Sequence, residues 1–188
     1  MKNIILIFLL SLSLITPTFA QESYGKTLNV GIGIGGYSGY YGYLGRSTPI
    51  FHVNYELSVG KNLTIAPFVT IHTRKDKYYW GNPNKPMRYY AYRETIIPIG
   101  IKLTYYFDQL LEAGEDWDFY LAGSLGYSII NTHWEDGYDG DRYYYGNPGN
   151  LYLDLHIGTE YHINSRTGVF FDLSNGVSIL GFSIHPKY

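Results

Sequence analysis

Residues 95–107 alternate large apolar side chains with small or polar ones. The large residues are Ile97, Ile99, Ile101, Leu103, Tyr105 and Phe107. A period of two predicts a β-strand with one apolar face. That face ends in aromatic residues, as is typical of a strand at the point where a bilayer meets water. The pattern therefore predicts a strand of a membrane-spanning barrel.

The same alternation recurs along most of the chain. It covers residues 28–36, 50–59, 63–73, 119–130, 151–163, 169–174 and 177–188. Together with residues 95–107 these segments predict about eight strands, the size of the smallest closed membrane barrels. Asn175-Gly176 between the last two segments is a strong signal for a two-residue hairpin turn. Residues 108–116 are compatible with one helical turn.

Long and short connections alternate between these predicted strands. Residues 37–48, 74–92 and 131–150 form long loops of roughly 10–20 residues, whereas the connections between them are shorter. Membrane barrels share this asymmetry, with long loops outside the cell and short turns in the periplasm. Asn175-Gly176 is the exception on the long-loop side, so we expect a low rim there.

The face opposite the apolar one carries glycine, serine and charged residues. A soluble lipocalin-like barrel is the alternative fold, and its apolar face would point inward around a ligand. Charged residues such as Glu56 and Lys102 would line such an apolar pocket badly if the lipocalin interpretation held. We therefore predict an all-β fold, a closed antiparallel transmembrane barrel with an up-and-down meander. Pro67 and Pro98 lack a backbone donor, so we expect a bulge or weakened pairing near them.

Composition agrees with export and a single domain. The 188 residues carry a formal net charge of −2 and no cysteine, which argues against nucleic acid binding, disulfides and thiolate chemistry. Residues 1–20 have a positive end, an apolar core and a small-x-small site before Gln21, as a cleaved signal peptide does. We expect residues 21–188 to form the barrel domain, located in the outer membrane of a Gram-negative cell.

Four segments resemble the small outer-membrane β-barrel proteins of the porin-like/OmpX–OmpA-type superfamily, especially those of Bacteroidetes. They are IPIGIKLTYYF (97–107), FYLAGSLGYS (119–128), LHIGTEYHI (155–163) and GVFFDLSNGVSILGFSI (168–184). The resemblance implies fold and membrane location, and it supplies no catalytic motif. It also implies that the terminal aromatic residue, Tyr188, serves as the signal read by the barrel-insertion machinery.

Charged residues at inward positions form the first candidate site. We expect an interior polar network of Glu56, Lys102, Asp154, His156, Glu160 and Asp172. An eight-stranded barrel is just filled by its side chains, so we interpret this network as a structural plug. A narrow solute or ion pore is the alternative. A lipid-modifying enzyme is a weaker one, because no serine, histidine and carboxylate lie together in the sequence.

The two largest loops form the second candidate site. They carry near copies, YYWGNP (78–83) and YYYGNP (143–148), and opposite charges, which we expect to attract each other across the rim. Acidic residues within 135–141 suggest a calcium site only weakly, since the EF-hand pattern is absent. Aromatic residues suit contact with an extracellular ligand. The candidates are Tyr78, Tyr79, Trp80, Trp134, Tyr143, Tyr144 and Tyr145.

The sequence thus predicts a monomeric, non-enzymatic protein with a role in envelope structure or surface-loop binding, without cofactor or metal. Its expected partners are outer-membrane lipid, lipopolysaccharide, the barrel-insertion machinery and an extracellular ligand at the long loops. Basic loop residues would face lipopolysaccharide phosphates. They are Arg74, Lys75, Lys77, Lys85 and Arg88.

Overall fold

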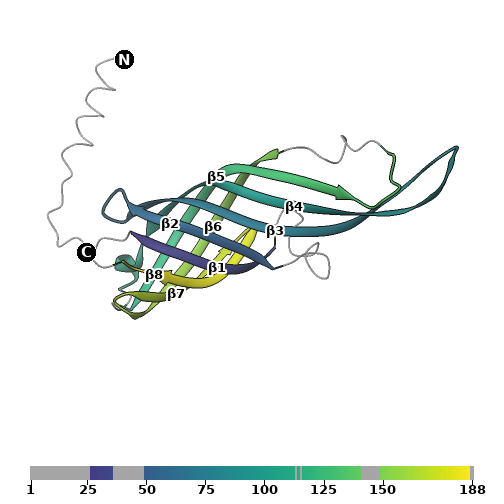
Figure 1. The fold of residues 1–188 in the computed structure, drawn as a ribbon. Coiled ribbons are helices and arrows are strands. Elements are labelled where there is room, and N and C mark those ends of the chain that lie inside the picture. Colours follow the sequence, from purple (N-terminus) through teal and green to yellow (C-terminus); the bar gives the residue numbers. More distant parts are fainter. Residues whose placement is uncertain (1–25, 36–48, 113, 115, 141–148, 187–188) are drawn as a thin grey trace, which may run out of the picture.

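Eight antiparallel strands close into a barrel in sequence order, with β1 paired to both β2 and β8 (Figure 1). The computed structural model describes residues 26–35, 49–112, 114, 116–140 and 149–186. The strands are β1 (Thr27–Gly35), β2 (Ile50–Ser58), β3 (Leu63–Asn82), β4 (Lys85–Tyr106), β5 (Trp117–Trp134), β6 (Gly149–Asn164), β7 (Thr167–Ser174) and β8 (Val177–Ile184). The predicted eight-stranded meander is confirmed. The expected signal peptide and Tyr188 lie outside the described residues.

Apolar side chains cover the outside of the barrel, and polar ones fill the inside. Leu155, for example, is 74% exposed, whereas its neighbours Asp154 and His156 are buried. The exposed apolar set draws on all eight strands and includes Val30, Ile32, Phe51, Val53, Val69, Ile71, Ile99, Ile101, Leu121, Leu125, Leu153, Ile157, Phe171, Leu173, Leu180 and Phe182. This is the reverse of a soluble barrel, so the lipocalin-like alternative is excluded. The fold is that of a transmembrane β-barrel.

Glycine allows two pairs of neighbouring strands to approach closely. Gly100 of β4 lies opposite Gly126 of β5, and a Cβ atom built on Gly126 would lie 2.2 Å from the carbonyl oxygen of Ile99. Gly31 of β1 and Gly181 of β8 form a similar pair at the point of closure. Real Cβ atoms do not make such contacts, so a side chain at these positions would push the strands apart.

A long two-stranded ribbon replaces the loop predicted at residues 74–92. The β3–β4 ladder extends from Leu63 and Tyr105 to Asn82 and Lys85 with a gap near Pro98, and Figure 1 shows the two strands running well beyond the others. The loop prediction is wrong because the apolar alternation ends near Thr73 while the strand alternation itself continues with aromatic and charged residues. We call residues 72–96, which extend beyond the exposed apolar side chains of the barrel, the raised ribbon. The end of the barrel from which this ribbon extends is the ribbon end.

Each of the two prolines interrupts one ladder without changing the register. β2 and β3 lose pairing between Asn54/Phe68 and Leu57/Ile65, which is where Pro67 lies. β3 and β4 lose pairing between Val69/Ile99 and His72/Ile96, which is where Pro98 lies. The predicted weakened pairing is confirmed, and it takes the form of a local gap without an inserted residue.

Short connections mark the opposite side, which we call the turn end. Asp108–Leu111 forms a 3₁₀ turn between β4 and β5, and residues 165–166 join β6 to β7. At the ribbon end, β7 ends at Ser174 and β8 begins at Val177, so the predicted two-residue turn and its low rim are confirmed.

The close approach at Gly126 leads to a stability prediction. Gly126→Ala should lower the free energy of unfolding by about 1–3 kcal/mol, because its methyl group would overpack against the β4 backbone. Gly123→Ala is the control on the same strand, since a Cβ there meets only a leucine methyl 3.8 Å away. Urea unfolding and heat-modifiable gel migration of the two variants check this, and equal midpoints would contradict it.

Candidate functional site

A buried ion pair occupies the middle of the barrel. Lys102 Nζ of β4 lies 2.5 Å from Asp172 Oδ2 of β7, and their side chains are 5% and 1% exposed. Tyr120 of β5 donates its hydroxyl to the same oxygen at 3.1 Å, and Lys102 Nζ lies 4.9 Å from the centre of the Tyr120 ring. A charge removed from water is tolerated when it is paired and hydrogen-bonded, and both conditions hold here.

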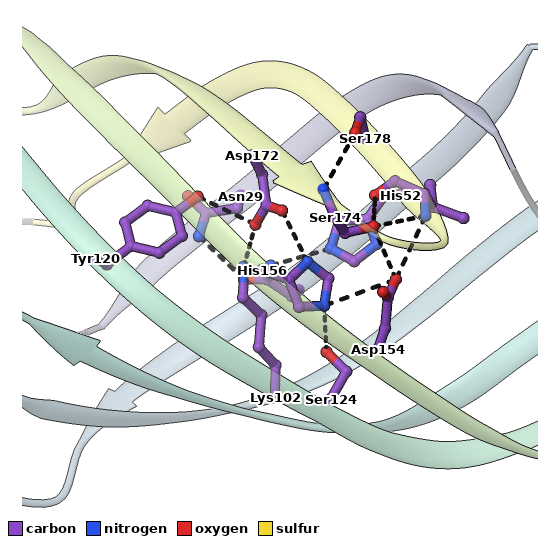
Figure 2. A network of polar contacts seen from close by, with 12 residues as sticks. Asn29, His52, Lys102, Tyr120, Ser124, Asp154, His156, Asp172, Ser174 and Ser178 are labelled. Carbon is purple, nitrogen blue, oxygen red and sulfur yellow. Dashed lines mark hydrogen bonds and ion pairs between the residues drawn. The ribbon is translucent and has the colours of Figure 1, made fainter. Parts of the chain in front are cut away.

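His156 and Ser124 extend this pair into a chain of four groups (Figure 2). His156 Nδ1 lies 2.7 Å from Asp172 Oδ1, and His156 Nε2 lies 2.9 Å from Ser124 Oγ. Both contacts are satisfied when Nδ1–H donates to the carboxylate and the Ser124 hydroxyl donates to Nε2. Hydroxyl, imidazole and carboxylate then stand in the order used by serine hydrolases.

The surroundings of this chain do not suit hydrolysis. Ser124 is only 5% exposed, and Asp172 is already held by the Lys102 ammonium. Sequence reasoning missed the arrangement because its hydroxyl, imidazole and carboxylate come from three strands, β5, β6 and β7. Only the register, with Ser124 opposite Asp154 and Gly158 opposite Asp172, brings them together.

A second polar cluster lies nearer the turn end, around Glu56. Its Oε2 accepts hydrogen bonds from Thr64 at 2.8 Å and Tyr106 at 2.7 Å, while Oε1 accepts one from Asn29 at 2.9 Å. Three neutral donors thus replace water around this buried carboxylate. Asn29 also donates to Asn54, which reaches His52. The clusters of Glu56 and Asp172 therefore fill successive levels of the same interior.

Asp154 forms hydrogen bonds with the β7–β8 turn, which is the low rim of the ribbon end. Its carboxylate accepts the backbone N–H of Gly176 at 3.0 Å and the hydroxyl of Ser174 at 2.9 Å (Figure 2). Tyr152 donates to the same carboxylate at 2.9 Å. The side chain thus satisfies the donors of the β7–β8 turn from the neighbouring strand, which is a structural role. The sixth predicted network residue, Glu160, lies at the turn end and contacts His185.

A pocket of about 210 Å³ opens above these clusters at the ribbon end. It is lined by His72, Ile96, Pro98, Ser128, Leu151, Tyr152, Leu153, Asn175, Gly176 and Val177. Within the described residues, His72 Nδ1 and Ser128 Oγ are buried without a hydrogen-bond partner. A pocket of this size has room for water, and a water molecule between these atoms would satisfy both. Ser128 lines the pocket, whereas Ser124 does not.

Aromatic rings form a small core between the inward face of the raised ribbon and the end of β5 with the residues that follow it. The Trp134 and Tyr138 rings stack with centroids 4.0 Å apart, and Tyr138 is 1% exposed. Tyr78 and Trp80 of β3 pack edge-on against Tyr138. Three of the predicted binding residues, Tyr78, Trp80 and Trp134, therefore lie in this core. Burial there also raises the pKa of the Tyr92 hydroxyl, and Glu94 adds to the effect.

Ion pairs tie the raised ribbon to the segment after β5. Lys85 contacts Asp139, and Arg88 Nη2 lies 3.6 Å from Glu135 Oε1. The predicted attraction across the rim is thus present, although through Lys85 and Arg88. Arg74, one of the basic residues predicted to face lipopolysaccharide phosphates, pairs with Glu94 at 2.7 Å. Glu135 is thereby engaged with a cation, which weakens the alternative of a calcium site.

The outward face of the raised ribbon is both basic and aromatic. Lys75 and Arg93 are cross-strand partners, and Lys77 follows on the same face. All three are exposed. Beyond them, Tyr79 and Tyr89 are 51% and 65% exposed, with ring centroids 4.9 Å apart. Sequence reasoning missed Tyr89 and Arg93 because that stretch was interpreted as a loop, and alternation across residues 74–93 is the signal that identifies them.

Tyr143, Tyr144 and Tyr145 lie outside the described residues, as does the second copy of the Asn-Pro motif. The four other aromatic residues predicted to bind a ligand lie on two different faces. Tyr79 points outward, and the others belong to the aromatic core.

Comparison with known proteins adds two distant structural likenesses. No family model matches the chain, and no curated protein does. A structure titled "De novo design of transmembrane beta-barrels" matches with 10% identity and a TM-score of 0.45, covering 87% of this chain and 98% of that one. Ail, the attachment invasion locus protein of Yersinia pestis solved with sucrose octasulfate, matches with 8% identity and a TM-score of 0.45, over 84% and 94%. In the described part of the chain, no helix is long and apolar enough to span a membrane.

The central ion pair generates a second prediction. Lys102→Met should destabilise the barrel by about 3–5 kcal/mol, because it leaves the Asp172 carboxylate buried without its cation. Exposed Lys75→Met is the matched control and should change stability by less than about 0.5 kcal/mol. Unfolding monitored by tryptophan fluorescence in lipid vesicles measures both. A Lys102 variant as stable as the control would show that the pair is dispensable.

Proposed function

We propose that this protein is a non-enzymatic barrel of the outer membrane, whose raised ribbon binds the anionic headgroups of lipopolysaccharide in the outer leaflet. The observation that carries the proposal is the change of chemistry along one continuous outward face. On β3 that face carries exposed Val69 and Ile71, then Thr73, then Lys75 and Lys77. It is apolar where it would meet acyl chains and becomes basic immediately above.

β4 repeats the same order on the neighbouring strand. Exposed Ile99 is followed by Ile97, Thr95 and then Arg93, which pairs with Lys75 across the ribbon. At about 3.3 Å per residue, Lys75 lies roughly 13 Å along the strand from Ile71. This distance is suited to phosphate groups just outside the hydrocarbon layer. Arginine and lysine are the residues that bind such groups.

The tip of the ribbon supports a second contact further out. Tyr79, Tyr89 and Met87 are each more than half exposed, on the same face as the basic residues. Aromatic rings supply contact area at low entropic cost, so this part suits a sugar chain or a protein at the cell surface. The envelope role and the surface-binding role then belong to successive levels of one ribbon.

A narrow pore is the alternative role, and the pocket at the ribbon end favours it. Against a pore, the interior also holds the buried Lys102–Asp172 pair and the bulky side chains of Tyr106 and Tyr120, none of which lines the pocket. An enzymatic role is disfavoured by the burial of Ser124. We infer a closed barrel that serves as a membrane anchor for its ribbon.

Charge reversal tests the lipopolysaccharide proposal. Lys75→Glu/Arg93→Glu should weaken binding of lipopolysaccharide to the detergent-solubilised barrel by about tenfold or more, because two cations become anions at the headgroup level. Binding is measured by titration with fluorescently labelled lipopolysaccharide, and the effect should shrink at high salt.

The control reverses two cations at the turn end, Lys61→Glu/Arg166→Glu, and should bind as the unmodified protein does. Equal binding by the ribbon variant and the control would overturn the proposal.

Planar bilayers test the closed interior. The barrel should show no stable conductance steps, whereas Lys102→Ala/Tyr120→Ala, which removes two side chains from the centre, should show small steps if the variant inserts. Steps of the same size from the unmodified protein would establish the pore role instead.

A further inference from the structure

Two histidines and a glutamate meet at the turn end, and of the three only Glu160 belongs to the network predicted from the sequence. Glu160 and His162 are successive inward residues of β6, and His185 follows the end of β8. One ligand-capable atom of each lies within 4.8 Å of the other two. β7 is paired to both β6 and β8, and at its start His162 lies opposite Gly168 while Ile184 lies opposite Thr167, which brings these two chain segments to the same edge (Figure 1).

The distances are close to those of a metal site. Glu160 Oε1 lies 2.8 Å from His185 Nε2 and 3.9 Å from His162 Nδ1. Ligand atoms bound at 2.0–2.1 Å in a tetrahedral site stand about 3.3 Å apart. Every pair of the three ligand atoms lies within 4.8 Å, so shifts of about 1.5 Å or less would bring all three to the spacing of a tetrahedral site.

The other nitrogen of each histidine already has a hydrogen-bond partner. His162 Nε2 lies 2.8 Å from Asp118 Oδ2 of β5, and His185 Nδ1 lies 3.0 Å from Thr27 Oγ1 of β1. Metal-binding histidines characteristically donate their second N–H to a carboxylate or another oxygen, which fixes the tautomer and the ring orientation. Here the partners leave His162 Nδ1 and His185 Nε2 facing Glu160.

The backbone and the surroundings also fit an ion. His162 N–H donates to the Asp116 carbonyl at 2.8 Å, and His185 N–H donates to the Arg166 carbonyl at 2.8 Å, so both ligand segments are anchored. A Cβ on Gly168 would lie 2.2 Å from Glu160 Oε1, so glycine leaves the room that this carboxylate occupies. Both histidine side chains are 24% exposed, which opens the site to solvent at the rim.

We propose that Glu160, His162 and His185 form a binding site for a divalent transition metal of the zinc type. Two imidazoles and a carboxylate suit Zn²⁺ and leave its fourth position to water. Such an ion would join β6 to the segment after β8, and its outer hydrogen bonds would reach β5 and β1. The site would therefore link strands on both sides of the β1–β8 pair that closes the barrel.

Zinc titration of the tag-free protein in detergent, in competition with a chromophoric chelator, tests the site. We expect one tightly bound Zn²⁺ per barrel, and His162→Gln and His185→Gln should each weaken binding at least tenfold. Asp118→Asn, which keeps all three ligands, should weaken it by about 10–100-fold through the lost orientation of His162. Co²⁺ should give the visible absorption of a tetrahedral ion, and Zn²⁺ should abolish it.

His133→Gln is the matched control, because His133 is an exposed histidine of β5 at the ribbon end. It should bind Zn²⁺ as the unmodified protein does. Zn²⁺ should also raise the unfolding temperature of the unmodified protein and of His133→Gln, each measured against the same protein in chelator, because a ligand of the folded state stabilises it. Equal Zn²⁺ affinity in His133→Gln and Asp118→Asn would overturn the proposal, even if the histidine variants failed to fold. So would the absence of tight binding to the unmodified protein.

Discussion

The need to pair every backbone polar group governs this structure. Hydrocarbon supplies no hydrogen-bond partners, so a sheet within it must close on itself. Closure joins β8 to β1, and there Gly31 and Gly181 let the two strands approach closely. Prolines are costly in such a sheet because they remove a donor. Pro67 and Pro98 each interrupt one ladder, yet the register resumes unchanged, so the cost stays local.

Closure also determines the chemistry of the interior. Since the outward residues of every strand must be apolar, the alternate residues face a narrow lumen, whatever their polarity. A charge there needs a partner on another strand. Lys102 meets Asp172 across the lumen, and Glu56 is surrounded by neutral donors instead. The hydroxyl–imidazole–carboxylate order at Ser124 follows from the same requirement for full hydrogen bonding, and its resemblance to a catalytic relay ends at its burial.

The alternation of residues was enough to predict which face each side chain occupies. It identified the strands, their number and the inward position of residues such as Asp154 and Glu160. It could not supply the register between strands, because the contacts of Asp172 with Lys102 and His156 depend on how β4, β6 and β7 are aligned. The ribbon was missed for a different reason. Its alternation combines aromatic with charged residues, as in Tyr78 and Lys77, whereas the aliphatic alternation that predicts the other strands ends near Thr73.

The raised ribbon shows how one alternation serves two environments. Along the outward face of β3, Ile71 and Lys75 obey the same geometry, but one suits acyl chains and the other phosphate. On the inward face, the polar residues of the lumen give way to the aromatic core around Tyr138, against which Tyr78, Trp80 and Tyr92 of the ribbon pack. The turn end has no such extension. There, Glu160, His162 and His185 converge because β6 and β8 pair with the two sides of β7 at its first residues, so the chemistry of this rim follows from strand register, whereas that of the other rim follows from strand length.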